Sequence, residues 1–313
     1  MKKQISRRTA LRTMVGSAAV LGSAAALAPT LTAAEGDVVR AKLKGNIHHS
    51  VSAWCYGSLF NAGKNKPAKM SFEEFCVECA KLGLESVELL GAKEWPAVKK
   101  AGLTCAMCNG PDGIGYGWNR VEHHEDLLGK FETAIPEVAA NGFPTIITFS
   151  GNRKGKDKWG EYSLTDEEGL ENCVKGLKKL APIAEKNKVT VTVELLNSKV
   201  DHKGYMADKS AWGIELCKRV GSERIKLLFD IYHMAIMEGD LIRSIKDNGQ
   251  YIAHYHTGGN PGRNEIDDTQ ETYYPAVMRA IVASGYKGFV GQEFVPKRDP
   301  LTSLAEAIKI CDV

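Results

Sequence analysis

Short apolar segments alternate with longer amphipathic segments along most of the chain. The apolar segments have the length of buried strands, and the amphipathic ones repeat apolar residues at the spacing of a helix that covers a sheet with one face. The predicted strands are residues 47–54, 84–90, 103–109, 143–149, 189–196, 225–230, 251–257 and 287–294. The predicted helices include residues 71–82, 123–140, 166–187, 209–219, 240–248, 272–284 and 301–311.

This alternation of strands and helices predicts the fold class. Strands that are joined through helices form parallel βαβ units, and eight such strands close a (β/α)8 TIM barrel. Residues 35–313 suit one domain of this kind, since these barrels run to roughly 250 residues. The alternative is an open doubly wound sheet, but no GxGxxG motif follows the first predicted strand. We therefore predict a single-domain α/β barrel.

The first residues of the chain have the pattern of an export signal. The basic stretch "MKKQISRRTALR" precedes "TMVGSAAVLGSAAALAPTLTAA", which is rich in small and apolar residues. The paired Arg7 and Arg8 resemble a twin-arginine signal, although Ala10 stands where that signal usually has phenylalanine. We predict that residues 1–34 are this signal and that residues 35–313 are exported to a bacterial periplasm. The alternatives are an ordinary secretory signal or an uncleaved anchor.

Charge and cysteine content narrow the class of protein further. The net charge of +3 includes the basic residues of the predicted signal, so the remaining chain is slightly acidic. Nothing in it favours nucleic acid or a lipid surface as a partner. Two cysteine pairs have CxxC spacing, but each lies in a predicted helix or strand, without the turn of a zinc knuckle. We predict buried free thiols at Cys76, Cys79, Cys105 and Cys108.

Polar residues lie near the ends of four consecutive predicted strands. These residues are Glu194, Asp230, His256 and Glu293. The carboxyl ends of the strands of a TIM barrel meet at one mouth, so these side chains are expected to converge. Three converging carboxylates repel one another unless a cation lies between them. The alternative is that each acid is paired separately with a helix N-terminus or an arginine.

An oxygen-rich set with one nitrogen suits a particular group of metals. Mn²⁺, Mg²⁺ and Co²⁺ accept such ligands in a roughly octahedral site, with positions left for water and substrate, whereas zinc is less well matched. The sequence therefore predicts one divalent metal ion, Mn²⁺ or Mg²⁺ with Co²⁺ as a further candidate.

Several long motifs resemble the hydroxypyruvate isomerase family, a branch of the xylose-isomerase-like TIM barrels. They are "VELLNSKVDH", "FDIYHMAIMEGD", "IAHYHTGGNPGRNEID" and "GFVGQEFVPKRDP". The resemblance implies that Glu194, Asp230, His256 and Glu293 bind the metal and that Glu194 and Glu293 also transfer the proton. The best-known hydroxypyruvate isomerases carry glutamine where His256 stands, whereas the related ketose 3-epimerases carry histidine.

Three further residues are candidates for binding the substrate. His233 follows Asp230 by three positions, and the resemblance implies that it polarises a substrate oxygen; the alternative is a histidine bonded to nearby backbone. Arg263 lies in the Gly-rich stretch "GGNPGRNE" and suits bidentate binding of a carboxylate. Asn197 follows Glu194 closely and is expected to contact substrate hydroxyls or a carboxylate.

Two other residues near the strand ends are expected to have structural roles. Glu88 ends the second predicted strand and is expected to line the mouth or order a loop. His254 is expected to point away from His256.

These observations leave three classes of function open. The first is an isomerase that converts hydroxypyruvate, or a similar short hydroxycarbonyl acid, to tartronate semialdehyde through an enediolate that the metal stabilises. The second is a ketose 3-epimerase, or a keto-sugar lyase or dehydratase, that uses the same metal and glutamate pair. The third is a non-catalytic sugar-binding barrel. The expected partner is a small hydroxycarbonyl or sugar molecule, and homo-oligomers are common in the group that the chain resembles.

Overall fold

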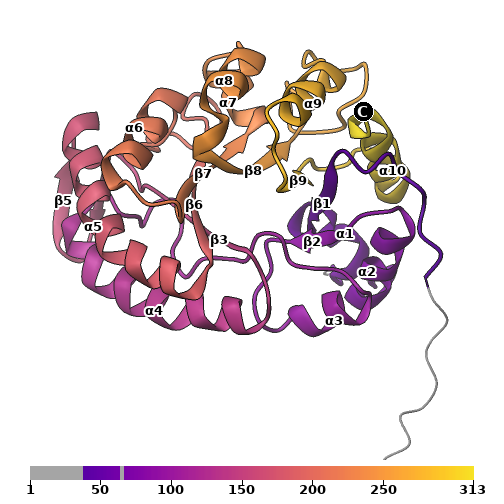
Figure 1. The fold of residues 1–313 in the computed structure, drawn as a ribbon, viewed down its shortest axis with the longest axis horizontal. Coiled ribbons are helices and arrows are strands. Elements are labelled where there is room, and N and C mark those ends of the chain that lie inside the picture. The colour runs from indigo at the N-terminus through magenta and orange to yellow at the C-terminus, as the bar shows by residue number, and fades with distance from the viewer. Residues whose placement is uncertain (1–37, 64–66) are drawn as a thin grey trace, which may run out of the picture. The chain divides into compact units, whose positions relative to one another are not determined.

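The computed structural model describes residues 38–63 and 67–313. Seven parallel strands form the central sheet, with one helical layer outside it (Figure 1). The order of the strands across the sheet is β2 (Ser86–Glu88), β1 (His48–Ser52), β9 (Phe289–Gln292), β8 (Ile252–Thr257), β7 (Ile225–Asp230), β6 (Thr190–Leu195) and β3 (Thr145–Thr148). The export signal predicted for residues 1–34 lies outside the described residues.

The third predicted strand, residues 103–109, is not a regular strand. It connects the two edge strands of the sheet through isolated bridges, Ser86 with Thr104 on one side and Cys108 with Ile146 on the other. Between these bridges the N–H of Ala106 donates to Ser86 Oγ at 2.8 Å. The serine hydroxyl thus takes the place of a backbone carbonyl on a partner strand. The sheet with this connecting segment therefore has the TIM-barrel arrangement that the sequence predicts.

The main helices agree with the predicted segments. They are α2 (Phe72–Lys81), α4 (His124–Ala140), α5 (Asp166–Asn187), α6 (Ser210–Val220), α8 (Leu241–Asn248), α9 (Tyr274–Ala283) and α10 (Pro300–Cys311). The start of α5 follows from its sequence, because the Thr165 side chain accepts from Glu168 N while the Glu168 carboxylate accepts from Thr165 N. This reciprocal pair satisfies backbone donors that the first helical turn leaves free.

Several short elements were not predicted. The short helices are α1 (Gly57–Phe60), α3 (Trp95–Lys100) and α7 (Ile231–Met237), and the 3-10 turns are η1 (Ala53–Tyr56), η2 (Val121–His123) and η3 (Gly249–Tyr251). An antiparallel hairpin, β4 (Lys154–Asp157) with β5 (Gly160–Ser163), follows β3. Of these, α7 matters for the site, because it begins directly after the last residue of β7.

The interior between the sheet and the helices is apolar, and the cysteines belong to it. All eight cysteines are buried and free, which confirms the prediction for the two CxxC pairs. None of the helices in the described part of the chain is long and apolar enough to cross a membrane.

Candidate metal centre

The structure brings together the four predicted metal ligands. Glu194 lies on β6, Asp230 ends β7, His256 lies on β8 and Glu293 directly follows β9. Asp230 and His256 are register partners in the parallel pair of β7 and β8. One ligand atom from each of the four side chains lies within 4.8 Å of the others, and all four residues are buried. Adjacent parallel strands therefore place these groups at one mouth of the barrel.

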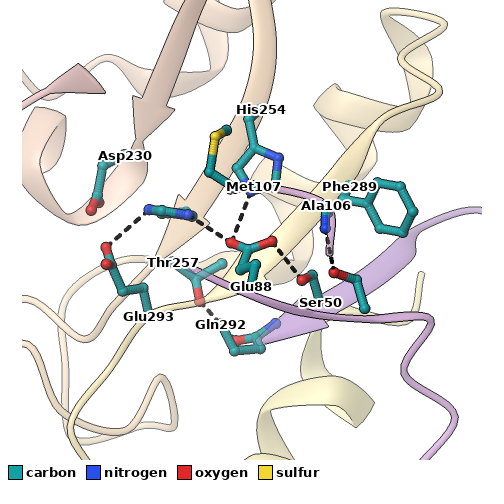
Figure 2. Close-up of polar contacts among 12 residues, drawn as sticks. Ser50, Glu88, Ala106, Met107, Asp230, His254, Thr257, Phe289, Gln292 and Glu293 are labelled. Atoms are coloured by element: carbon teal, nitrogen blue, oxygen red, sulfur yellow. Dashed lines mark hydrogen bonds and ion pairs between the residues drawn. The ribbon is translucent and has the colours of Figure 1, made fainter. Parts of the chain in front are cut away.

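The imidazole of His256 is held by a carboxylate behind it. His256 Nε2 and His254 Nε2 lie 2.8 and 2.9 Å from Glu88 Oε1, and the Ser50 hydroxyl donates to Glu88 Oε2 at 2.5 Å (Figure 2). Burial opposes the negative charge on Glu88, but the two histidines outweigh burial and lower its pKa to about 2. Glu88 is thus ionised and accepts the Nε2–H of His256, which directs Nδ1 toward the other three ligands.

Two expectations about this part of the site need correction. His254 was expected to point away from His256, but both rings contact the same oxygen of Glu88. The physical reason is that side chains two positions apart in a strand lie on the same face of the sheet. Glu88 neither orders a loop nor lines the cavity at the barrel mouth; it crosses the barrel interior from β2 to β8. Gly291 on β9 permits this crossing, because a Cβ there would lie 2.2 Å from Glu88 Oε1.

The charges and the unpaired atoms of this cluster suit a divalent cation. His256 Nδ1 lies 2.9 Å from Glu293 Oε2 and 3.5 Å from Glu194 Oε1. Asp230 Oδ2 is buried and has no hydrogen-bond partner among the described residues, and His256 Nδ1 meets Glu293 at ion-pair distance without hydrogen-bond geometry. Burial raises the pKa of Glu194 and raises that of Asp230 to about 8. A bound cation would favour the ionised form of both carboxyl groups, and three carboxylate oxygens with one imidazole nitrogen form a fitting donor set.

Glu293 differs from the other acids because both of its oxygens have donors. The indole N–H of Trp54 donates to Oε1 at 2.8 Å, and Arg263 donates to Oε2 at 2.6 Å. Burial favours its neutral form, but His256 and Arg263 outweigh burial and hold the pKa of Glu293 well below its usual range. The Arg263 guanidinium also lies 3.6 Å from Asp230 Oδ2 and 5.2 Å from the centre of the Trp54 ring.

His233 is placed by helix α7, which the sequence did not predict. Asp230 caps this helix by accepting the backbone N–H of His233 at 3.2 Å. The Asn197 amide donates to His233 Nδ1 at 2.6 Å, and this places the ring proton on Nε2, which lies 3.6 Å from Asp230 Oδ2. Burial lowers the pKa of His233 well below its usual range, so the ring is neutral. His233 thus presents an N–H group beside Asp230 of the four-residue cluster.

Asn197 uses all of its polar atoms within the protein. Its amide nitrogen donates to Asp201 Oδ2 at 2.6 Å as well as to His233, and its oxygen accepts from the backbone of Val200 and Asp201. The expected contact between Asn197 and the substrate stays a prediction, whereas its contact with the ring of His233 is direct.

A cavity of about 580 Å³ opens over the cluster. Its walls include Glu194, Glu293 and Arg263 from the cluster and Leu89, Ile147, Phe149 and Leu196 as apolar groups, together with Asn109 and Asp112. A second cavity of about 480 Å³ borders the first and shares Trp54, Leu89 and Asn109 with it. The acidic cluster therefore lies in the wall of a space that is large enough for a small organic molecule.

The fold and this acidic cluster define a class of protein. Residues 77–312 match the family described as xylose isomerase-like TIM barrel, and the chain belongs to this family. The structure of a 3-keto-D-glucoside 4-epimerase from E. coli superposes with a TM-score of 0.67 at 18% identity, covering 84% of this chain and 98% of that one. At this identity the superposition supports the fold alone.

Several curated relatives of the chain are named as isomerases. The chain is 25% identical over 229 residues to a 2-oxo-tetronate isomerase of Pectobacterium atrosepticum, covering 70% of this chain and 84% of the relative. It is 31% identical over 152 residues to a hydroxypyruvate isomerase of Escherichia coli, covering 47% of this chain and 57% of the relative. The predicted resemblance to the hydroxypyruvate isomerase family and the predicted enzyme class, an isomerase, are confirmed.

Proposed function

We propose that this protein is a divalent-metal-dependent isomerase of a short hydroxycarbonyl acid, with conversion of hydroxypyruvate to tartronate semialdehyde as the reaction to test first. The observation that carries the proposal is the convergence of Glu194, Asp230, His256 and Glu293, two of which, Glu194 and Glu293, line one cavity. The isomerases among the relatives, which are named for oxo acids, support an acid as the substrate.

These four residues would hold the cation, His256 through Nδ1 and the acids through carboxylate oxygens. Mn²⁺ and Mg²⁺ suit this donor set. When bound, the cation supplies positive charge that polarises the substrate carbonyl and stabilises negative charge on its oxygens. Arg263 provides a planar pair of donors at the same wall, which suits the substrate carboxylate. The neutral His233 carries its Nε2–H beside Asp230, 3.6 Å from Oδ2, and suits a substrate oxygen as acceptor.

The isomerisation requires movement of two protons. One leaves C3 of hydroxypyruvate and enters at C2, and the other passes from the C3 hydroxyl to the C2 oxygen, so that the ketone becomes an alcohol and the alcohol becomes an aldehyde. Glu194 suits the first transfer, since its carboxylate is less restrained than that of Glu293 and meets His256 Nδ1 at the longer distance of 3.5 Å. Glu293 is restrained by Trp54 and Arg263. We assign Glu194 as the base and Glu293 as the second acid or base.

The test uses the chain from Glu35 onward, prepared with Mn²⁺ for kinetics and with Mg²⁺ for proton NMR in D₂O. We expect conversion of hydroxypyruvate with deuterium appearing at C2, and we expect a chelator to abolish it. Glu194→Gln and Glu293→Gln should each lower the rate by about 10² to 10⁴. A metal-loaded protein that leaves hydroxypyruvate unchanged would refute this substrate.

A second candidate is a ketose 3-epimerase or a keto-sugar lyase or dehydratase. The histidine at position 256 and the size of the cavity favour it, since about 580 Å³ exceeds what a three-carbon acid fills. The same NMR assay with a ketohexose and with a 3-keto-glucoside separates the candidates, because turnover confined to the sugars would select the second. A non-catalytic sugar-binding barrel would show binding without deuterium exchange in any of these substrates.

We also propose export to the periplasm by the twin-arginine route, on the basis of Arg7 and Arg8. Fractionation of bacteria that express the tagged chain tests this proposal. Replacement of both arginines by lysine should retain the protein in the cytoplasm, and unchanged export would contradict the assignment.

A further inference from the structure

We propose that Asp112 binds a hydroxyl group at the end of the substrate that is remote from the metal centre, and that it thereby selects hydroxy acids with more than three carbons. This inference rests on the proposed function, because it takes the four-ligand cluster as the reacting end of the cavity.

Asp112 lies in the same cavity as the cluster but on another part of its wall. Glu194 and Glu293 line this cavity together with Asp112 and Asn109. Asp112 follows the connecting segment 103–109 and contacts the end of β3, whereas Asp230, His256 and Glu293 come from β7, β8 and the residue after β9. Glu194 lies on β6, which is next to β3 in the sheet, so a substrate that is held at the cluster meets Asp112 with the part of the molecule that extends past Glu194 toward β3.

The carboxyl group of Asp112 is fixed on one side and free on the other. Its Oδ2 accepts from the Thr148 hydroxyl at 2.5 Å and from the backbone N–H of Phe149 at 3.0 Å. The indole of Trp118 donates to Thr148 Oγ1 at 2.7 Å, and this contact directs the threonine proton to Asp112. Asp112 Oδ1 is buried and has no hydrogen-bond partner among the described residues. A buried carboxylate oxygen without a donor is costly, and a ligand hydroxyl would remove this cost.

Two neighbouring features keep this oxygen unpaired. Gly110 lies so close that a Cβ there would be 2.7 Å from Asp112 Oδ1 and 2.1 Å from the Ile147 carbonyl oxygen. The adjacent wall is otherwise apolar, with Ile114 and Ile147. Burial is the main reason that the pKa of Asp112 is raised to about 7, and Thr148 and Phe149 only partly offset it. Oδ2 thus holds the end of β3 in place, whereas Oδ1 has no partner among the described residues and suits recognition of a donor.

The test measures binding, so that it does not depend on turnover. Glycerate, a four-carbon aldonic acid and gluconate are titrated into the Mg²⁺-loaded protein by calorimetry at pH 8, above the pKa of Asp112. We expect affinity to rise by about tenfold or more once the acid is long enough to reach Asp112. Asp112→Asn, whose amide oxygen can still accept from Thr148 and Phe149, should lose this gain and bind glycerate as the wild type does. Asp112→Ala should give the same result.

Glu73→Gln is the matched control, since Glu73 is an exposed carboxylate in the wall of the neighbouring cavity. The Glu73→Gln variant should still bind longer acids more tightly than glycerate. Equal affinities along the series in the wild type, or a gain that survives in Asp112→Asn, would overturn the role of Asp112. If the gain depends on Asp112 while hydroxypyruvate is not turned over, the proposed reaction fails and the role of Asp112 stands. If hydroxypyruvate is turned over but affinity does not rise with the length of the acid, the proposed reaction stands and the role of Asp112 fails.

Discussion

Replacement of Glu88 by glutamine tests whether the carboxylate behind His256 tunes the metal centre. Glutamine keeps the size of the side chain and offers one oxygen to the two imidazole N–H groups, which lie 2.8 and 2.9 Å from the carboxylate now. Its amide nitrogen can donate to the Ser50 hydroxyl oxygen, so the hydrogen-bonded arrangement survives. The substitution therefore removes the negative charge and changes little else.

The size of the effect follows from these contacts. A hydrogen bond to a charged group contributes about 1.5 to 3 kcal/mol and a neutral one about 0.5 to 1.5 kcal/mol, so the bond to His256 loses about 1 to 2 kcal/mol. A weaker bond makes the imidazole a poorer donor to the metal. We expect the Kd for Mn²⁺ to rise by about 5- to 30-fold, which agrees with the usual cost of changing a group that supports a metal ligand.

Titration of Mn²⁺ followed by electron paramagnetic resonance measures this change. Glu85→Gln is the control, because Glu85 makes the same type of contact, at 2.9 Å, with the exposed His48 on the barrel surface. An unchanged Kd in Glu88→Gln, or an equal rise in Glu85→Gln, would refute the reasoning. Thermal unfolding without metal should show that both variants are folded.

Two further predictions concern catalysis and stability. Trp54→Phe removes the N–H that donates to Glu293 Oε1 and keeps an aromatic ring beside Arg263; we expect kcat to fall by about tenfold with little change in KM, and initial rates that match the wild type would contradict this. Burial lowers the pKa of His49 to about 4 from 6.5, so the unfolded chain binds the proton more tightly. The free energy of unfolding therefore carries no penalty from His49 above pH 6.5. It falls by up to about 3 kcal/mol as the pH falls toward 4, because the unfolded chain takes up the proton first. Urea unfolding at pH 7 and pH 4.5 should show a smaller pH dependence in His49→Phe than in the wild type.

The sequence was sufficient to predict the barrel and the convergence of Glu194, Asp230, His256 and Glu293 for one physical reason. Parallel strands that alternate with helices bring their carboxyl ends to one mouth, so the last residues of neighbouring strands meet whatever the loops do. Glu194, Asp230 and His256 lie at or near such strand ends, and Glu293 lies one residue beyond its strand.

The parts that sequence reasoning missed depend on contacts across the barrel or on short segments. The contact of Glu88 with His254 and His256 joins strands that are not neighbours in the sheet, and no local pattern reports it. The spacing of His254 and His256 could nevertheless have indicated their shared contact, since side chains two residues apart in a strand lie on the same face of the sheet. Helix α7 was missed because its apolar sequence continues that of β7, and only the cap that Asp230 provides marks its start.

The contact between Glu88 and His256 links residues 168 positions apart in the sequence. It requires β2, β8 and β9 to be in place together, since Glu88 crosses the interior beside Gly291. Pairings of this range form late in folding, because the chain must close a long loop before the contact contributes. A nascent chain that lacks its final strand thus has neither the oriented imidazole nor Glu293. Full affinity for the proposed cation would therefore arise only once β9 is in place, and binding of that cation would report a finished barrel during synthesis.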